Sequence, residues 1–278
     1  ADRIGRRRVF LMGVVVFTIG SMACGLAPSL GLLIAAEALE AIGAALLIPA
    51  SLALLLRAFD RSRVPVVVAI WGAISASAGA AGPPLGALLV DHLSWRWAFF
   101  INLPVGIVSF FLGRRVLRES EEDTAGRLPD PLTVGLLAVG MASFTLAIVQ
   151  TDDWGWTGAR TVAAFAIGVG LLAAFVVRAR MIPTPVLHLE LFANRDFRWA
   201  NVAALVFAIG FNAMFLGNVL FLTGVWKYSI LRAGVAVALG PAIVALTAPF
   251  FGRLAARIGQ RALLIPGGLV YGASGLLL

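Results

Sequence analysis

Long runs of hydrophobic residues, separated by short polar stretches, dominate the pattern of the chain. Eight runs are complete, and a ninth begins near residue 262. They cover residues 9–27, 32–56, 64–90, 98–113, 132–150, 161–178, 199–222 and 233–252. An apolar run of about 20 residues can cross a bilayer as a helix, whereas the strands of a membrane barrel alternate over segments of about 10 residues. The pattern therefore predicts eight full membrane-spanning helices and part of a ninth.

Composition agrees with this reading and removes two classes of protein. Of the 278 residues, 60% are hydrophobic and 13% are charged, and the mean hydropathy is +0.96. Soluble domains carry about 25% charged residues, and disordered chains have low hydrophobicity. The net charge of +8 comes from short basic clusters between the apolar runs. These clusters do not form the continuous basic face that nucleic acid binding needs. We expect an all-α membrane protein that does not bind nucleic acid.

The basic residues predict which side each loop faces. The loops alternate between two sets, and one set holds 18 of the 22 Lys and Arg residues. That set comprises residues 1–8, 57–63, 114–131, 178–198 and 253–261, and the other comprises 28–31, 91–97, 151–160 and 223–232. Basic loops stay on the cytoplasmic side. We therefore predict that the first set is cytoplasmic and that the protein lies in the cytoplasmic membrane as a multi-pass protein.

A short repeat marks two places in the chain. Residues 1–8 read ADRIGRRR and residues 255–262 read AARIGQRA, so Arg3, Gly5 and Arg7 match Arg257, Gly259 and Arg261 at an offset of 254. Both copies lie in a predicted cytoplasmic loop just before an apolar run. Transporters are often built from such internal repeats. The repeat indicates two related halves.

The repeat resembles the cytoplasmic loop motif of the major facilitator superfamily, Gly-x-x-x-Asp-Arg-x-Gly-Arg-Arg. Its first copy supplies Asp2, Arg3, Gly5, Arg6 and Arg7, and its second supplies Arg257, Gly259 and Arg261. The resemblance implies a cytoplasmic gate at these residues. Eight spans between the copies are typical of the fourteen-span drug:proton antiporter branch, the EmrB/QacA type.

The resemblance also implies a division of the chain. Residues 1–118 are expected to form the last four spans of an N-terminal six-helix half, 119–190 a cytoplasmic linker with two extra central spans, and 191–278 the start of the C-terminal half. The chain is thus expected to be an internal fragment of a major facilitator helical bundle.

Two further stretches resemble the same branch. Gly82, Pro83 and Gly86 match the antiporter motif Gly-x-x-x-Gly-Pro-x-x-Gly-Gly, and the stretch WRWAFFINLPVG at 95–106 matches the entry to the following span. Small residues let helix backbones approach closely, and a Gly-Pro pair bends a helix. The resemblance therefore implies a close, bent helix contact at this motif; simple helix packing is the alternative for any single glycine.

Two acidic residues, Glu37 and Glu40, lie inside an apolar run. Spaced three residues apart, they share one helical face. An ionised acid in the middle of a spanning helix costs about 2.5–3.5 kcal/mol, so such residues indicate function. The family resemblance places Arg where Glu37 stands and Gln where Glu40 stands. We hypothesise that the pair holds a proton near neutral pH, or binds a cationic substrate; alternatively the two acids reach outward to water or pair with a basic residue outside this chain.

The 199–222 run carries aromatic rings at helical spacing. Phe207, Phe211 and Phe215 recur every four residues on one face, and Asn218 follows. Rings and amides suit an amphiphilic ligand, which makes these residues a possible substrate wall. Lipid-facing rings with packing between helices are the alternative.

The residues disfavour enzyme chemistry. The single cysteine, Cys24, is isolated, both histidines fall between the apolar runs, and no phosphate-binding Walker loop is present. We therefore expect no cofactor and no metal site. The leading function is proton-coupled efflux of small amphiphilic or drug-like compounds, with a small-molecule substrate, protons and the lipid bilayer as partners. The alternatives are a facilitator for another solute, a non-transporting sensor and, remotely, an intramembrane enzyme. The oligomeric state stays open, with a monomer as the simplest expectation.

Overall fold

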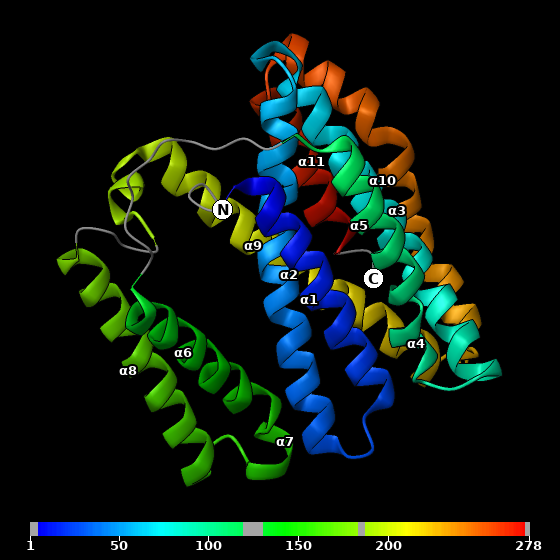
Figure 1. Ribbon diagram of the computed structural model, residues 1–278, viewed down its shortest axis with the longest axis vertical. Coiled ribbons are helices and arrows are strands. Elements are labelled where there is room, and N and C mark those ends of the chain that lie inside the picture. The colour runs from blue at the N-terminus through cyan, green and yellow to red at the C-terminus, as the bar shows by residue number, and fades with distance from the viewer. Residues whose placement is uncertain (1–4, 119–129, 183–186, 276–278) are drawn as a thin grey trace. The chain divides into compact units, whose positions relative to one another are not determined.

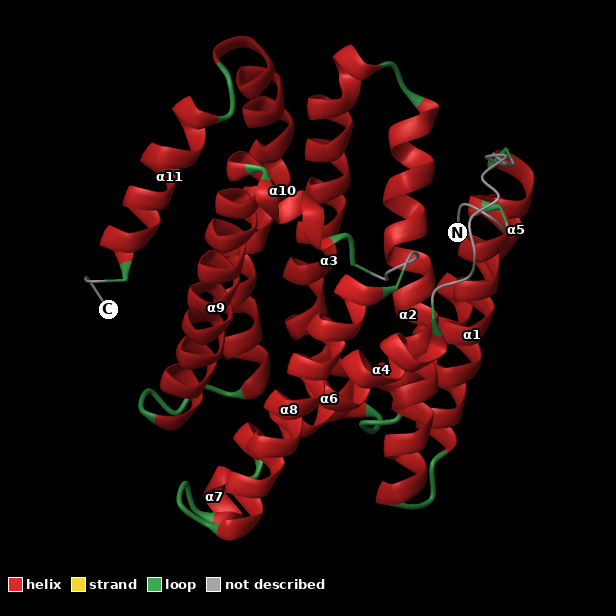
Figure 2. Ribbon diagram, turned by 90° about the vertical axis from the view of Figure 1, so that its left-hand side faces the viewer, coloured by secondary structure: helices red, strands yellow, loops and turns green. Residues whose placement is uncertain are grey.

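The computed structural model describes residues 5–118, 130–182 and 187–275, and every regular element in these ranges is helical (Figures 1 and 2). The elements are α1 (Arg6–Leu26), α2 (Leu30–Ala58), η1 (Arg61–Arg63), α3 (Val64–His92), α4 (Trp97–Phe100), α5 (Asn102–Val116), α6 (Pro131–Val149), α7 (Thr151–Trp154), α8 (Ala159–Met181), η2 (Leu189–Ala193), α9 (Arg195–Gly224), α10 (Ile230–Ile258) and α11 (Arg261–Ser274). Eight helical segments in the described ranges can span a membrane, with α4 and α5 together forming the fourth. The predicted all-α membrane architecture is confirmed.

The helices begin at residues that satisfy their free backbone N–H groups. Ser29 accepts a hydrogen bond from the Leu32 amide at the start of α2, and Ser229 accepts one from the Arg232 amide at the start of α10. Asp130 does the same for Thr133 at the start of α6, where Pro131 occupies the first helical position. Such caps stabilise helix starts because the first-turn amides have no partner within the helix.

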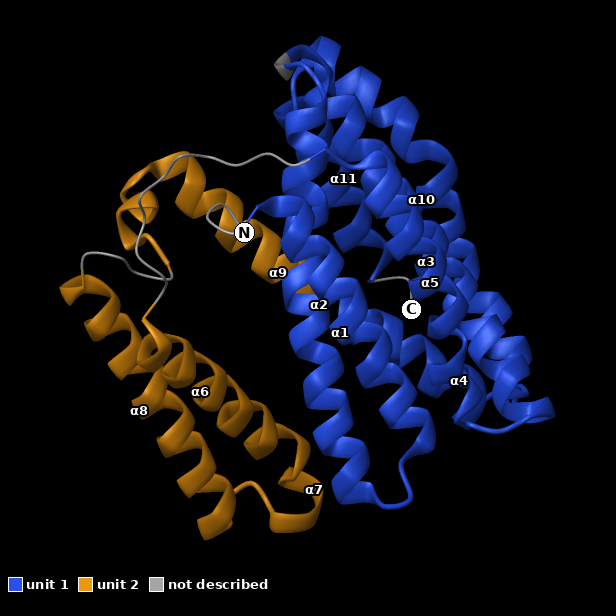
Figure 3. Cartoon of the chain, viewed as in Figure 1, with its two compact units in different colours: residues 1–124, 210–278 blue, residues 125–209 orange. Residues whose placement is uncertain are grey.

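The chain divides into two compact units (Figure 3). Unit 1 comprises residues 1–124 and 210–278, and unit 2 comprises residues 125–209. The boundary falls within α9, whose first half belongs to unit 2 and whose second half belongs to unit 1. The division into two halves and a central insertion stays a prediction.

Unit 2 contains the antiparallel hairpin of α6 and α8 (Figure 1). Glycines bring the two backbones together: a Cβ on Gly168 would lie 2.8 Å from the Phe144 amide nitrogen, and one on Gly140 would lie 3.1 Å from Leu172. The Phe144 and Phe165 rings pack edge to face beside this crossing, with centroids 5.4 Å apart. Close packing at small residues is what holds helices together in lipid, where no hydrophobic effect acts between them.

An ion pair joins the ends of the same hairpin. Arg178 Nε of α8 donates to Asp130 Oδ2 at 2.6 Å, and the Thr133 hydroxyl donates to the same oxygen at 2.7 Å. The hydrogen bond from Arg178, followed by those from Thr133, holds the pKa of Asp130 well below its ordinary range. Asp130 is therefore ionised throughout the physiological range, which makes this pair structural.

We expect Asp130→Ala to lower the melting temperature of the protein by a few degrees, on the order of one lost interaction. The pKa of Asp130 is depressed in the folded state, so its stabilisation is present above the ordinary aspartate pKa and is lost as the pH falls through the lower folded value. The stability difference between wild type and variant should accordingly stay constant from pH 6 to pH 8, roughly the neutral range. Thermal unfolding at several pH values measures this, and a difference that changes across the range would contradict it.

In unit 1, α1 packs on α2 by one face and on α4 and α5 by another. On the α2 side, a Cβ on Gly13 would lie 2.7 Å from the Leu47 amide nitrogen. On the other side, Ser21 Oγ donates to the Phe99 carbonyl and accepts from Asn102 Nδ2 at 2.9 Å. Small residues on α1 therefore allow three neighbouring segments to approach one helix.

Candidate functional site

Glu37 and Glu40 lie in the first half of α2. Counted from Leu30, they stand about 10 and 15 Å along the helix at 1.5 Å per residue. The Glu37 side chain is exposed and Glu40 is half-buried. The two carboxylates thus share a face of one helix but differ in their surroundings.

The surroundings of Glu40 come from α1. A Cβ on Gly20 would lie 2.6 Å from the Glu40 amide nitrogen and 2.7 Å from its Cα, so only glycine allows this approach. One turn further along α1, Cys24 is fully buried and its Sγ lies 3.6 Å from Glu40 Oε2, where the thiol donates a weak hydrogen bond. Gly20 and Cys24 therefore fix the position of Glu40, and sequence reasoning named neither of them as a partner of Glu40.

The neighbouring helices α1 and α3 supply no basic partner to Glu37 or Glu40 within the described residues. Within the described residues no basic side chain forms an ion pair with Glu37 or Glu40. Between Val64 and Val90, α3 carries no ionisable residue, and the ionisable residues of α1 are Cys24 and the arginines of its first turn. Within the described residues, neither α1 nor α3 therefore places a counter-charge against the two carboxylates.

The repeated motif has one conformation at both of its glycines. Gly5 precedes α1 with φ 98° and ψ 127°, and Gly259 follows α10 with φ 86° and ψ 152°. Residues with side chains rarely adopt this conformation, which gives a physical reason for the glycine in each copy. Asp2 and Arg3, the acid and base expected in the gate, lie outside the described residues.

The arginines of the motif lie at helix ends. Arg6 and Arg7 are in the first turn of α1, and Arg7 Nη2 donates to the Arg114 carbonyl at the end of α5 at 2.5 Å. Arg257 lies in the last turn of α10, and Arg261 begins α11. In the first copy, the motif therefore ties the start of one span to the end of another on the predicted cytoplasmic side.

We expect Gly259→Ala to destabilise the protein by about 1–3 kcal/mol, because the added Cβ is strained at this backbone conformation. Nothing lies within 4 Å of that Cβ, so a clash would not explain a loss. Thermal or denaturant unfolding measures the change. Gly267→Ala is the matched control, since its Cβ also meets nothing and its φ is not positive; equal stability of both variants would contradict the strain.

The antiporter motif lies in α3, which pairs with α10. A Cβ on Gly234 of α10 would lie 3.0 Å from the Pro83 carbonyl carbon, so the Pro83–Pro84 segment packs directly on that glycine. At the other end of the pair, a Cβ on Gly252 would lie 2.4 Å from the Ala69 Cβ. The earlier residue of α10, Gly234, faces the later part of α3 at Pro83, and the later residue, Gly252, faces the earlier part of α3 at Ala69. The two helices therefore run antiparallel. Gly82 and Gly86 make no comparable approach, since nothing lies within 4 Å of their Cβ positions.

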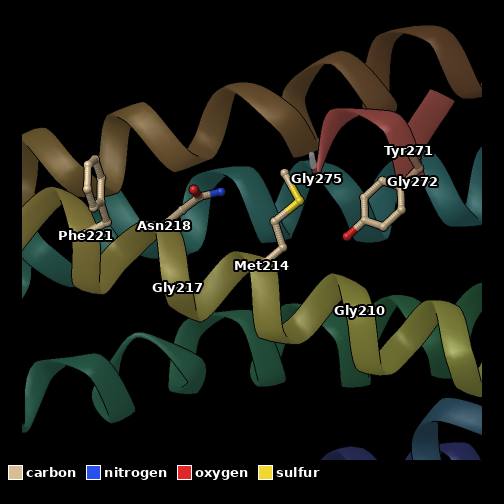
Figure 4. A pocket seen from close by; sticks show the side chains of 8 residues that line it. All are labelled: Gly210, Met214, Gly217, Asn218, Phe221, Tyr271, Gly272 and Gly275. Carbon is tan, nitrogen blue, oxygen red and sulfur yellow. The ribbon is translucent and has the colours of Figure 1, made fainter. Parts of the chain in front are cut away.

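The expected substrate wall of α9 is divided. Phe211 and Phe215 stack with centroids 6.3 Å apart, and Phe207 and Phe211 are exposed. Asn218 instead lines a cavity of about 470 Å³ between α9 and α11, and none of the three phenylalanines lines it (Figure 4). Sequence reasoning missed this cavity, although glycines seven residues apart at Gly210 and Gly217 were a visible signal of space on one face of the helix.

The chain is similar to known membrane transporters over its whole length. The sequence profile of the Major Facilitator Superfamily matches residues 1–278. The multidrug resistance protein Stp of Mycobacterium tuberculosis is 35% identical over 270 residues, which cover 96% of this chain and 50% of that protein. The tetracenomycin C resistance and export protein of Streptomyces glaucescens is 29% identical over 98% of this chain and 51% of its own length. The multidrug export protein EmrB of Escherichia coli is 28% identical over 95% and 52%. The chain spans about half the length of the curated relatives it matches.

Proposed function

Because the chain belongs to the Major Facilitator Superfamily, whose members are membrane transporters and not enzymes, we propose that it exports small amphiphilic or drug-like compounds across the cell membrane. The observation that carries this proposal is the 35% identity, over 96% of the chain, to a relative named for multidrug resistance. Two relatives named for export, of lower identity, support the same direction of transport.

We propose further that Glu37 and Glu40 couple export to protons. Two carboxylates on one helical face repel each other when both are ionised, and a proton on one of them removes this repulsion. A cationic compound binds the ionised pair from the cytoplasm. On the outer side a proton adds to one carboxylate and the cation leaves. The singly protonated pair, which keeps one negative charge, then faces inward and releases the proton to the cytoplasm. One proton then moves inward as one compound moves outward.

Unequal positions of the two acids support this mechanism. Glu40 is held against α1 by Gly20 and Cys24, whereas Glu37 is exposed. A fixed carboxylate beside a free one gives a proton a defined site and leaves the second group to meet a ligand. The α3–α10 pair supports the accompanying motion, because its prolines interrupt helical hydrogen bonds where the two helices touch.

The experiment is accumulation of a fluorescent amphiphile in cells that express the protein, with and without an uncoupler. We expect low accumulation that rises to the level of non-expressing cells once the proton gradient collapses. A facilitator would equilibrate the compound in both conditions, and a sensor would leave accumulation unchanged. Either of those results would overturn the proposal.

A further inference from the structure

The cavity between α9 and α11 lies wholly within unit 1, and residues of these two helices line it. Met214, Asn218 and Phe221 line it from α9, and Tyr271 lines it from α11 (Figure 4). Met214 extends from α9 toward the end of α11. The cavity begins at mid-helix near Gly210 and reaches Phe221, three residues before α9 ends at Gly224. It therefore runs from the middle of the span toward the end that the basic loops predict to be outer.

Glycines give this cavity its open walls. Gly217 of α9 and Gly272 of α11 both line it, and nothing lies within 4 Å of the Cβ position of either. The first atom of a side chain at either position would therefore meet no neighbour. The volume of about 470 Å³ is within the range of pockets that hold drug-sized molecules.

The lining chemistry selects an uncharged aromatic ligand. A thioether and two aromatic rings offer favourable contacts to another ring, and the Asn218 amide offers a hydrogen-bonding group. No charged side chain lines the cavity. A cation placed there would lose its hydration without an acid to replace it, which is costly in a membrane interior.

The predicted outer end of the cavity carries positive charge. The Phe221 ring packs on Trp226 and Trp226 packs on Tyr228, with centroids 5.4 and 5.5 Å apart. The Arg232 guanidinium lies 3.8 Å from the centre of the Tyr228 ring. The Arg232 guanidinium already occupies a face of this aromatic cluster, so it repels a cation that approaches from outside. An uncharged ring meets no such repulsion.

We propose that the α9–α11 cavity binds flat, uncharged aromatic compounds, separately from the carboxylate pair on α2. Its relevance to export rests on the proposed function, but its occupancy does not. The α2 pair holds cationic groups and this cavity holds uncharged rings, so one chain accepts two chemical classes of compound.

The test is equilibrium binding of N-phenyl-1-naphthylamine, an uncharged aromatic dye, to the purified protein in nanodiscs without a proton gradient. Gly217→Leu and Gly272→Leu fill the cavity from opposite walls. We expect each to weaken saturable dye binding by at least about tenfold. Gly267→Leu on α11 is the matched control, since its Cβ also meets nothing and it does not line the cavity; it should bind as wild type does.

Ethidium, a flat aromatic cation, is the second probe. Its binding should be unchanged by Gly217→Leu and Gly272→Leu. The proposal is overturned if the dye binds all four proteins equally, or if ethidium binding falls in the two filled variants as well. Because the readout is binding without a gradient, a failure of proton-coupled export leaves this result intact, and a failure of dye binding leaves the export experiment intact.

Discussion

Replacing Glu37 and Glu40 together by glutamine is expected to abolish the pH dependence of transport while the protein still reaches the membrane. Glutamine keeps the shape of glutamate and cannot exchange a proton. Insertion should not suffer, because removing ionisable groups from a spanning helix spares about 2.5–3.5 kcal/mol for each charge that would be buried. The measurement is the initial rate of export from inverted vesicles across pH 6 to pH 8, roughly the neutral range.

The single variants should separate the two acids. We expect Glu40→Gln to have the larger effect on the pH profile, because Glu40 is the half-buried member held against α1. Cys24→Ser retains a donor near Glu40 Oε2 and should leave the profile close to wild type, whereas Cys24→Ala removes it and should shift the profile. A double glutamine variant with the wild-type rate and pH profile would show that both acids are structural.

Gly252→Leu is expected to remove transport by disrupting the α3–α10 pair. Even the first atom of a side chain would lie 2.4 Å from the Ala69 Cβ and 3.3 Å from the Pro65 carbonyl oxygen, so the helices must separate. Overpacking of this kind costs about 1–3 kcal/mol, and more where backbones are in contact. Export rate and thermal unfolding of the purified protein measure the loss.

Gly240→Leu, on the same helix, is the matched control. Nothing lies within 4 Å of its Cβ position, so a leucine there has open space. Its rate and melting temperature should stay near wild type. Equal losses in both variants would mean that any large residue in α10 is harmful, and equal retention would mean that the close approach at Gly252 is not needed.

The spans were predictable because the bilayer permits few solutions. An apolar run must form a helix to satisfy its own backbone, so hydropathy located all eight spans, and α11 begins at Arg261 beside the predicted position. The caps at Ser29 and Asp130, which mark the starts of α2 and α6, were seen only in the structure. Hydropathy is a local property of the sequence, so it locates a span without any information on which helices are in contact.

Helix neighbours were not predictable in the same way. Hydropathy places α3 and α10 in the membrane but does not pair them, and the contact of Gly252 with Ala69 joins residues far apart in the chain. For the candidate site, spacing alone placed Glu37 and Glu40 on one face. Their unequal exposure depends on Gly20 and Cys24 of another helix, and the α9–α11 cavity depends on Tyr271, so neither follows from the pattern of one run.

We propose that export and proton movement are one coupled exchange, and the lumenal pH of proteoliposomes tests this coupling directly. Vesicles would hold a trapped pH-sensitive dye and a cationic amphiphile, with no pH difference at the start. Exit of the compound down its gradient should carry protons inward and acidify the lumen, and the Glu37→Gln, Glu40→Gln double variant should show no acidification. Protein-dependent exit of the compound at the same rate, with the lumenal pH unchanged in the wild-type protein, would contradict the account.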